Sequence, residues 1–141
     1  TALALSLRYA GERSQFGKPI GKFQAVQHNL AVMAEQAYAA GMAAEIACRS
    51  ARAVPEPLLA ASGMLRAAAA AGPVSANAHA VHGAIGVTAE YDLQLYTRRL
   101  LQWRTDAGSE VYWSGVIGRA ALQSGDSALD FMRSRLFPAE A

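Results

Sequence analysis

The chain has 141 residues, which is enough for one domain with a single apolar core, and 52% of its residues are hydrophobic. Aromatic residues account for only 8% of the sequence and alanine is abundant, so the composition favours closely packed helices over sheet. The net charge of +2 is small and the 13 basic residues are scattered, which argues against a nucleic-acid or membrane-surface partner.

Two helices joined by a turn are predicted at the start of the chain. Apolar residues spaced for one helical face predict a helix over residues 2–13 whose start is missing. Residues 14–21 contain two glycines and a proline, which disfavour a continuing helix. A second, long helix is expected from Lys22 to Ala53, because a residue that precedes a proline, here Val54, is driven out of the helical region.

An apolar stripe runs along the predicted second helix at alternating steps of three and four residues. Its members are Phe23, Val26, Leu30, Met33, Ala37, Ala40, Ala44 and Ala47. This spacing keeps one helix face against a partner, so the segment is predicted to be a bundle helix. The lone cysteine, Cys48, cannot form an internal disulfide and is expected to be a small buried hydrophobe in this helix.

The third helix is predicted to begin near Pro57, which suits a first helical turn, and to run to Ala71. The pair Gly72-Pro73 then predicts either a kink or two collinear helices, with the second piece over Val74–Val81. The remaining expected elements are a loop at 82–86, a short helix over 90–101, and a last helical pair at 109–123 and 127–136. The order predicts an all-α, up-and-down four-helix bundle with additional short C-terminal helices.

A search for chemistry that a bundle could carry unaided finds none. No glutamate is followed three places later by histidine, as di-iron bundles require. The three histidines His28, His79 and His82 lack the cysteine or carboxylate spacing of a zinc site, so no metal is expected. No secretory signal and no apolar run of bilayer length are evident, which predicts a cytoplasmic protein without a membrane partner.

Four motifs carry a family resemblance. They are Tyr9-Ala10-x-Glu12-Arg13-x-Gln15-Phe16-Gly17, Phe23-Gln24-Ala25-Val26-Gln27, Val81-His82-Gly83-x-x-Gly86-Val87-Thr88-x-Glu90-Tyr91 and Gly108-Ser109-Glu110. Together they resemble the C-terminal helical domain of the FAD-dependent acyl-CoA dehydrogenases. The resemblance implies that residues 1–141 form this one domain, with the family's N-terminal helical domain and β-domain absent. It also implies that the neighbouring subunit completes the adenosine diphosphate half of each FAD site.

The resemblance assigns several residues to the cofactor. Arg13 would contact the FAD pyrophosphate, for which a planar guanidinium is a suitable donor; the alternative is a surface arginine paired with Glu12 or a helix end. Phe16 would pack on the adenine side, or would plug the end of the bundle instead. Gln24 would hydrogen-bond the cofactor, or would cap its helix. The remaining assigned positions are Gln15, His82, Gly83, Ala84 and Gly108, with the backbone of the 82–84 loop reaching the cofactor of the other subunit.

The catalytic position departs from the family pattern. In the family a glutamate removes the α-proton of the acyl-CoA while a hydride leaves the β-carbon for the flavin. Alignment on Ser109-Glu110 places Asp106 at that position, with a side chain one methylene shorter. Asp106 is therefore the first candidate base, although it would also suit a helix N-cap; Glu110 is the second candidate, and a base elsewhere or in a partner subunit is the third possibility.

The predicted function is α,β-dehydrogenation of an acyl-CoA thioester, with electrons passed to an electron-transfer flavoprotein. Departures such as Ala84 at a loop glycine resemble bacterial branches that act on bulky or steroid-like thioesters. The alternatives are a non-catalytic subunit that completes a partner's FAD site, a purely structural bundle, and a relative that uses the flavin for other oxidations. A homo- or hetero-oligomer, either a dimer or a tetramer, is expected. Four apolar residues near the C-terminus would form its interface or would instead belong to a terminal core helix: Phe131, Met132, Leu136 and Phe137.

Overall fold

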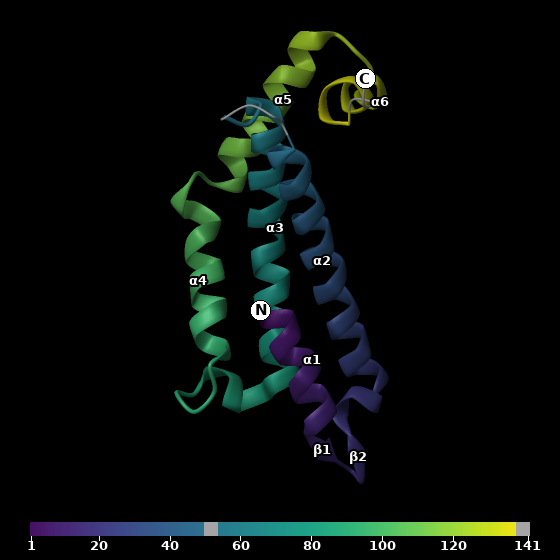
Figure 1. The fold of residues 1–141 in the computed structure, drawn as a ribbon, viewed down its shortest axis with the longest axis vertical. Helices are drawn as coiled ribbons and strands as arrows, with labels where there is room; N and C mark the ends of the chain where they lie inside the picture. Colours follow the sequence, from purple (N-terminus) through teal and green to yellow (C-terminus); the bar gives the residue numbers. More distant parts are fainter. Residues whose placement is uncertain (50–53, 138–141) are drawn as a thin grey trace.

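The computed structural model describes residues 1–49 and 54–137 and shows a predominantly helical fold (Figure 1). The helices are α1 (Ala2–Glu12), α2 (Gln24–Cys48), α3 (Pro57–His82), α4 (Leu93–Asp106), α5 (Glu110–Ser124) and the short α6 (Ala128–Phe131). The connecting elements are the strands β1 (Ser14–Gln15) and β2 (Lys18–Pro19), the 3-10 turns η1 (Ile20–Lys22) and η2 (Gly83–Val87), and the π-helical turn η3 (Met132–Leu136). The expected all-α bundle with additional short C-terminal helices is confirmed.

Helix α3 is the centre of the bundle and contacts α1, α2, α4 and α5 (Figure 1). The main core joins one or more buried residues from each of α1 to α4, namely Ala2, Met33, Val74, Ala78 and Leu93. Small residues let α2 and α3 approach closely. A Cβ atom added at Gly63 of α3 would lie 3.2 Å from the Ala47 Cβ of α2. The alanine-rich composition is therefore explained by close helix contacts.

Helix α3 continues through Pro73 as one helix, so the alternative of two collinear helices is wrong, whereas a kink at Gly72-Pro73 stays a prediction. A proline in a helix interior loses a hydrogen bond and clashes with the preceding turn, at a cost of about 3 kcal/mol. Buried residues on both sides of Pro73, among them Ala71 and Val74, pack against the neighbouring helices and offset that cost. The Asn77 side-chain amide also donates to the Pro73 carbonyl, at 2.8 Å.

Helix α2 is shorter than expected, because it begins at Gln24 and ends at Cys48. The expected continuation to Ala53 falls partly on residues 50–53, which lie outside the described residues. The predicted apolar stripe is only partly buried: Met33 and Ala47 are buried, whereas Ala37 and Ala44 are exposed. Cys48 is exposed, so its expected burial was wrong.

The turn after α1 contains a small antiparallel hairpin that the sequence did not predict. Strands β1 and β2 pair Ser14 with Pro19 and Gln15 with Lys18, which leaves Phe16 and Gly17 at the tip. Both tip residues have positive φ, 51° for Phe16 and 79° for Gly17. This is the arrangement of a two-residue hairpin turn whose twist matches the paired strands.

The C-terminal helical pair is confirmed, and both helices begin at a serine cap. The Ser109 Oγ accepts from the Tyr112 backbone N–H at 3.2 Å, and the Ser127 Oγ accepts from the Asp130 backbone N–H at 3.2 Å. Asp106 is therefore not the N-cap of α5; it is the last residue of α4. Phe131 is buried within the chain and belongs to the core, whereas Met132 and Phe137 are exposed.

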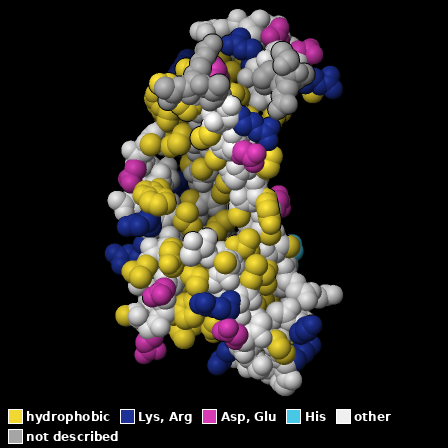
Figure 2. All heavy atoms as spheres, viewed as in Figure 1, with side chains coloured by type: hydrophobic (Ala, Val, Ile, Leu, Met, Phe, Trp, Pro, Cys, Tyr) yellow, Lys and Arg dark blue, Asp and Glu magenta, His cyan; other side chains and the backbone are white. Residues whose placement is uncertain are grey.

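One helical segment in the described part of the chain, residues 57–87, is long and apolar enough to cross a bilayer by length and composition. No apolar run of that length was expected from the sequence. Contacts with four neighbouring helices account for the apolar character of α3 as the central helix of a bundle. Lys and Arg side chains are scattered over the face shown in Figure 2 and form no continuous patch there.

Candidate functional site

A cavity of about 560 Å³ lies where α1 and α3 end, beside the β1–β2 hairpin. Among its lining residues are Arg13, Gln15, Phe16, His82, Gly83 and Ala84. These are six of the eight residues that the resemblance assigned to the cofactor. They come from two segments that are far apart in the sequence, and only the tertiary fold brings them together. We call this cavity the hairpin cavity.

Arg13 is the cation of the hairpin cavity, and its backbone is held on both sides. Its N–H donates to the Tyr9 carbonyl at 2.8 Å, and its carbonyl accepts from the Ile20 N–H at 2.8 Å. The side chain is exposed and forms no ion pair with any residue in 1–49 or 54–137, Glu12 included. A fixed backbone with a free guanidinium suits the binding of an anionic ligand.

Phe16 projects from the hairpin tip and is 91% exposed. Its ring meets the Phe23 ring edge-on, with centroids 6.1 Å apart. Such an exposed ring does not plug the end of the bundle, so that alternative is wrong. A large aromatic side chain on a backbone with positive φ is unusual, because this conformation is unfavourable for residues other than glycine, asparagine or aspartate.

The loop after α3 presents backbone to the hairpin cavity. Gly83 has φ of 65° and ψ of −145°, and no atom lies within 4 Å of the position that a Cβ would occupy. Glycine is required here by conformation, and the open space leaves the backbone accessible. The side chain of His82 is turned inward instead, and the residue is only 4% exposed. Burial lowers the pKa of His82 below its usual value.

Gln24 and Gly108 do not line the hairpin cavity. Gln24 is the first residue of α2 and is exposed, and its side chain makes no capping hydrogen bond with residues 1–49 or 54–137. Gly108 lies in the turn between α4 and α5, with φ of 110°. A Cβ at Gly108 would come within 2.9 Å of the Trp113 Nε1, so this position also requires glycine.

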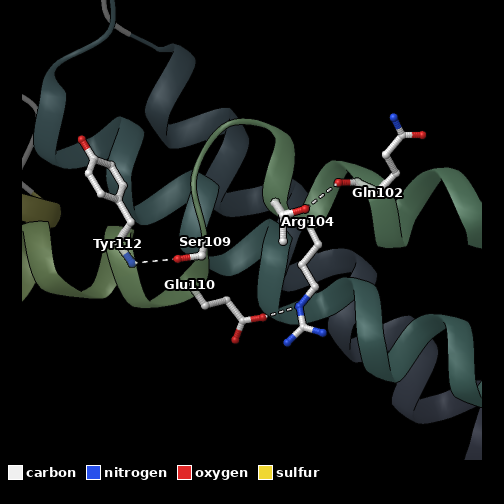
Figure 3. Close-up of polar contacts among 6 residues, drawn as sticks. Gln102, Arg104, Ser109, Glu110 and Tyr112 are labelled. Carbon is white, nitrogen blue, oxygen red and sulfur yellow. Dashed lines mark hydrogen bonds and ion pairs between the residues drawn. The ribbon is translucent and has the colours of Figure 1, made fainter.

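The two candidate bases lie around the α4–α5 turn. Figure 3 shows one of them, Glu110, with its ion-pair partner Arg104. Glu110, the first residue of α5, accepts from the Arg104 Nε at 2.6 Å. Glu110 and Arg104 both line a second cavity of about 400 Å³, together with Thr105 and Ser109. Asp106 is exposed and is not among the residues that line this cavity. Its carboxylate has no hydrogen bond or ion pair with the residues that the structure describes.

The two parts of the candidate site lie at different places along the bundle (Figure 1). The hairpin cavity is at the end where β1 and β2 lie, whereas the α4–α5 turn is at the far end of α4. Sequence reasoning missed Tyr9 and Tyr91 as ring partners of His82, and missed Arg104 as the ion-pair partner of Glu110. Tyr9 and Tyr91 lie within the quoted motifs, so the sequence could have indicated them as candidate site residues. The ion pair of Arg104 with Glu110 spans a turn, so no helical spacing in the sequence predicts it.

Comparison with known proteins gives a family for the chain. Residues 1–122 match the family described as the acyl-CoA dehydrogenase C-terminal domain. The chain is 38% identical over 97 residues to the acyl-CoA dehydrogenase IpdE2 of Mycobacterium tuberculosis, and the match covers 69% of this chain and 29% of that protein.

Solved structures share the fold. A glutaryl-coenzyme A dehydrogenase in complex with glutaryl-CoA superimposes with a TM-score of 0.80 and 29% identity, covering 86% of this chain and 31% of that one. The ChsE4–ChsE5 complex of Mycobacterium tuberculosis gives a TM-score of 0.79 and 28% identity, covering 90% of this chain and 34% of that one. The chain therefore belongs to the acyl-CoA dehydrogenase family, an FAD-dependent oxidoreductase family, and spans about a third of the length of these relatives. The family resemblance read from the sequence is confirmed.

Proposed function

We propose that the chain is the C-terminal domain of an FAD-dependent acyl-CoA dehydrogenase that forms the α,β double bond of an acyl-CoA thioester. The electrons pass on to an electron-transfer flavoprotein. The observation that carries the proposal is the hairpin cavity, where Arg13, Phe16 and the Gly83 backbone meet. Under this proposal, residues 1–141 act together with an N-terminal helical domain and a β-domain.

The residues of the hairpin cavity fit the adenosine diphosphate half of FAD. The Arg13 guanidinium, which has no ion-pair partner among the described residues, suits a doubly charged pyrophosphate, because bidentate hydrogen bonds to charged oxygens are strong. The exposed Phe16 ring offers a face for an adenine base. The open backbone at Gly83 allows close approach to the ligand. When bound, FAD supplies the hydride acceptor for the reaction.

Asp106 is the favoured base for removal of the α-proton. Glu110 already holds an ion pair with Arg104 at 2.6 Å, which stabilises its carboxylate and favours a structural role across the turn. Asp106 carries no such partner among the described residues. Its side chain must approach the α-carbon closely, because a general base acts only within hydrogen-bond reach.

A shared active site follows from the separation of the two parts. The base at the α4–α5 turn and the hairpin cavity lie apart in one chain, so one FAD site draws them from two copies or from two related subunits (Figure 1). An apolar groove of about 510 Å³ between α2, α3, α5 and η3, which includes the exposed Met132 and Phe137, is a surface suited to such association. We therefore propose an oligomer of at least two chains.

A second function is favoured by the exposure of Asp106, which does not line the cavity beside it. In this version the chain is a subunit without its own base that completes a partner's FAD site. The ChsE4–ChsE5 complex, a structure with two named components, is consistent with such pairing in the family.

The deciding experiment is an anaerobic titration of the full-length protein with acyl-CoA thioesters, monitored by flavin bleaching. The panel includes glutaryl-CoA, straight-chain thioesters and a steroid side-chain thioester. Bleaching in wild type that is lost in Asp106→Asn, with FAD still bound, supports the dehydrogenase and its base. The matched control is Asp126→Asn, which changes another exposed aspartate in the turn before α6.

Three other outcomes have distinct meanings. Bound FAD with no bleaching by any thioester supports the subunit that lacks its own base, particularly when bleaching appears after a second gene product is added. Bleaching that persists in Asp106→Asn rejects Asp106 and turns attention to Glu110. A full-length protein that is colourless, and stable without FAD, would indicate a purely structural bundle and would reject the proposed function.

A further inference from the structure

Three aromatic rings meet at the side of the hairpin cavity, and two of them, Tyr9 and His82, belong to residues that line it. The His82 imidazole stacks on the Tyr9 ring of α1, with centroids 4.5 Å apart and planes at 23°. On another side it meets the Tyr91 ring, which belongs to the turn before α4, at 4.9 Å. Tyr9 and Tyr91 also contact each other edge-on at 5.7 Å. We call these three residues the aromatic clamp.

Hydrogen bonds fix the orientation of the His82 ring. Its Nδ1 lies 2.8 Å from the Ala78 carbonyl, which can only accept, so Nδ1 carries the proton. The other ring nitrogen, Nε2, is buried and has no partner among the described residues. The Tyr9 hydroxyl donates to the backbone carbonyl of His82 at 3.5 Å, a long bond that nevertheless joins α1 to the start of the loop.

The clamp connects the two segments that form the hairpin cavity. Tyr9 lies one helical turn before Arg13, and its carbonyl accepts the Arg13 N–H. His82 directly precedes Gly83, whose backbone opens onto the cavity. A shift of α1 relative to α3 would therefore change the distance between the guanidinium and the loop backbone. Stacked rings resist such a shift, because each ring pair has a preferred geometry.

We propose that Tyr9, His82 and Tyr91 are positioning residues that hold Arg13 and the Gly83-Ala84 backbone at the spacing required by the diphosphate and adenosine of the cofactor. This inference rests on the proposed function and deepens it. The three side chains act through the residues beside them, and none is proposed to touch the reacting atoms. Their loss weakens cofactor binding and leaves the chemical step intact once the cofactor is bound.

The test compares Tyr9→Leu, Tyr9→Phe and wild type in the full-length protein. Tyr9→Leu removes the stacked ring, and its dissociation constant for FAD is expected to rise roughly 10-fold, the size of effect that aromatic pairs support. Tyr9→Phe keeps the ring and is expected to stay within about 2-fold of wild type, because only a long hydrogen bond is lost. Tyr38→Leu, which removes an exposed tyrosine from α2, is the matched control and leaves FAD affinity unchanged.

Two further measurements separate positioning from general stability. With saturating FAD, kcat and KM for the thioester are expected to match wild type in Tyr9→Leu, because the reacting groups are untouched. Hydrogen exchange of the amides of residues 83–87 is expected to accelerate in the cofactor-free protein, since the loop loses its attachment to α1. Tyr91→Leu, which removes another ring of the clamp, serves as a second variant if Tyr9→Leu does not fold, and is expected to weaken FAD binding relative to wild type.

Each remaining outcome has a definite meaning. Wild-type protein that binds no FAD rejects the proposed function itself. Wild type that binds FAD, with Tyr9→Leu unchanged in both affinity and loop exchange, overturns the clamp and leaves the proposed function standing. If Tyr9→Leu does not fold, a wild-type FAD affinity in Tyr91→Leu overturns the clamp in the same way. Equal weakening in Tyr9→Phe and Tyr9→Leu also overturns it, because the hydroxyl rather than the ring stack would then be responsible.

Discussion

Phe16 combines an unfavourable backbone conformation with a side chain that the fold leaves exposed. At φ of 51° a residue other than glycine pays a cost of about 1 kcal/mol or more, and asparagine is the residue that such turns favour. The packing of the described residues offsets little of this cost, because Phe16 is 91% exposed and its ring meets the Phe23 ring only edge-on. Strained positions of this kind are concentrated at functional sites, which agrees with a ligand-binding role for the ring.

Replacement of Phe16 tests the two effects separately. Phe16→Asn is expected to raise the free energy of unfolding by about 1 kcal/mol, because asparagine tolerates the turn. The same variant is expected to weaken FAD binding roughly 10-fold, because a stacked base loses its platform. Urea unfolding and FAD titration measure the two quantities. Phe16→Leu keeps the strain and loses the ring, so it should weaken binding without gaining stability; unchanged FAD affinity in both variants would remove Phe16 from the site.

His82 predicts a pH dependence of stability. Desolvation lowers its pKa below 6.5, His79 acts in the same direction, and the bond to the Ala78 carbonyl opposes them. The other titratable groups that face the ring are Tyr9 of α1 and Tyr91 of the turn before α4. In the unfolded chain the His82 imidazole takes up a proton near pH 6.5, whereas in the folded chain it takes up the proton only at a lower pH. Stability is therefore expected to fall as the pH drops below 6.5, until the pH has passed the lowered pKa of the folded state.

Urea unfolding at about pH 7.5 and about pH 5.5 measures this decline. His82→Phe is expected to lose less stability on acidification than wild type, because the titrating group is gone. His28→Asn, which changes an exposed histidine of α2, is the matched control and keeps the wild-type decline. An identical decline in His82→Phe and wild type would show that His82 does not titrate in this range.

At the scale of elements, glycines in α2 and α3 have opposite roles despite similar helical settings. Gly41 of α2 is exposed and has no atom within 4 Å of a Cβ position. Gly63 of α3 is buried, and its Cβ position lies 3.2 Å from the Ala47 Cβ and 3.3 Å from the Ala43 carbonyl oxygen. The first glycine only weakens its helix, whereas the second permits the close contact of α2 with α3.

The two glycine-to-alanine substitutions are therefore expected to change the free energy of unfolding in opposite directions. Gly41→Ala should raise the free energy of unfolding by about 0.5–1 kcal/mol through helix propensity. Gly63→Ala should instead lower the free energy of unfolding by about 1 kcal/mol or more. The added methyl group forces α2 and α3 apart, and this outweighs the gain in helix propensity. Chemical denaturation measures both changes. A stabilised Gly63→Ala protein would mean that the α2–α3 contact can relax around a methyl group.

At the scale of the whole molecule, the separation of the α4–α5 turn from the hairpin cavity predicts complementation between subunits. Under the proposed function, one copy supplies Asp106 and another supplies Arg13 to the same FAD site. Arg13→Ala and Asp106→Asn homo-oligomers should each be strongly impaired. A mixed oligomer contains one site with both changes and one site with neither, so co-expression should restore up to about a quarter of wild-type activity for random pairing into two-site dimers.

The complementation assay compares the co-expressed pair with each variant alone. Pairing two variants altered at the same place, Asp106→Asn with Asp106→Ala, is the matched control and should restore nothing. Recovery by Arg13→Ala with Asp106→Asn demonstrates a site shared between chains. Failure of that pair, with mixed oligomers shown to form, would place both residues in the same copy's site and reject the shared arrangement.

Much of the fold was predictable, because helix formation depends on local composition and spacing. The alanine-rich segments, Ser109 and Ser127 before their helices, and Pro57 at a first turn all act within a few residues of chain. The failures occurred where packing outweighed a local preference. Pro73 stays inside α3 because the central helix gains more from contacts on both sides than the proline costs.

Composition and helical spacing were enough to predict a helical bundle, and the motifs were enough to show the resemblance to the acyl-CoA dehydrogenases. Only the tertiary structure decided which motif residues meet: Arg13, Phe16 and Gly83 line one cavity, whereas Gly108 and Asp106 lie at another part of the bundle. It also decided that Cys48 is exposed and that the rings of Tyr9, His82 and Tyr91 meet in one cluster. The physical reason is that spacing along a helix specifies which residues share a face, but contact between residues more than seventy positions apart depends on how whole helices pack.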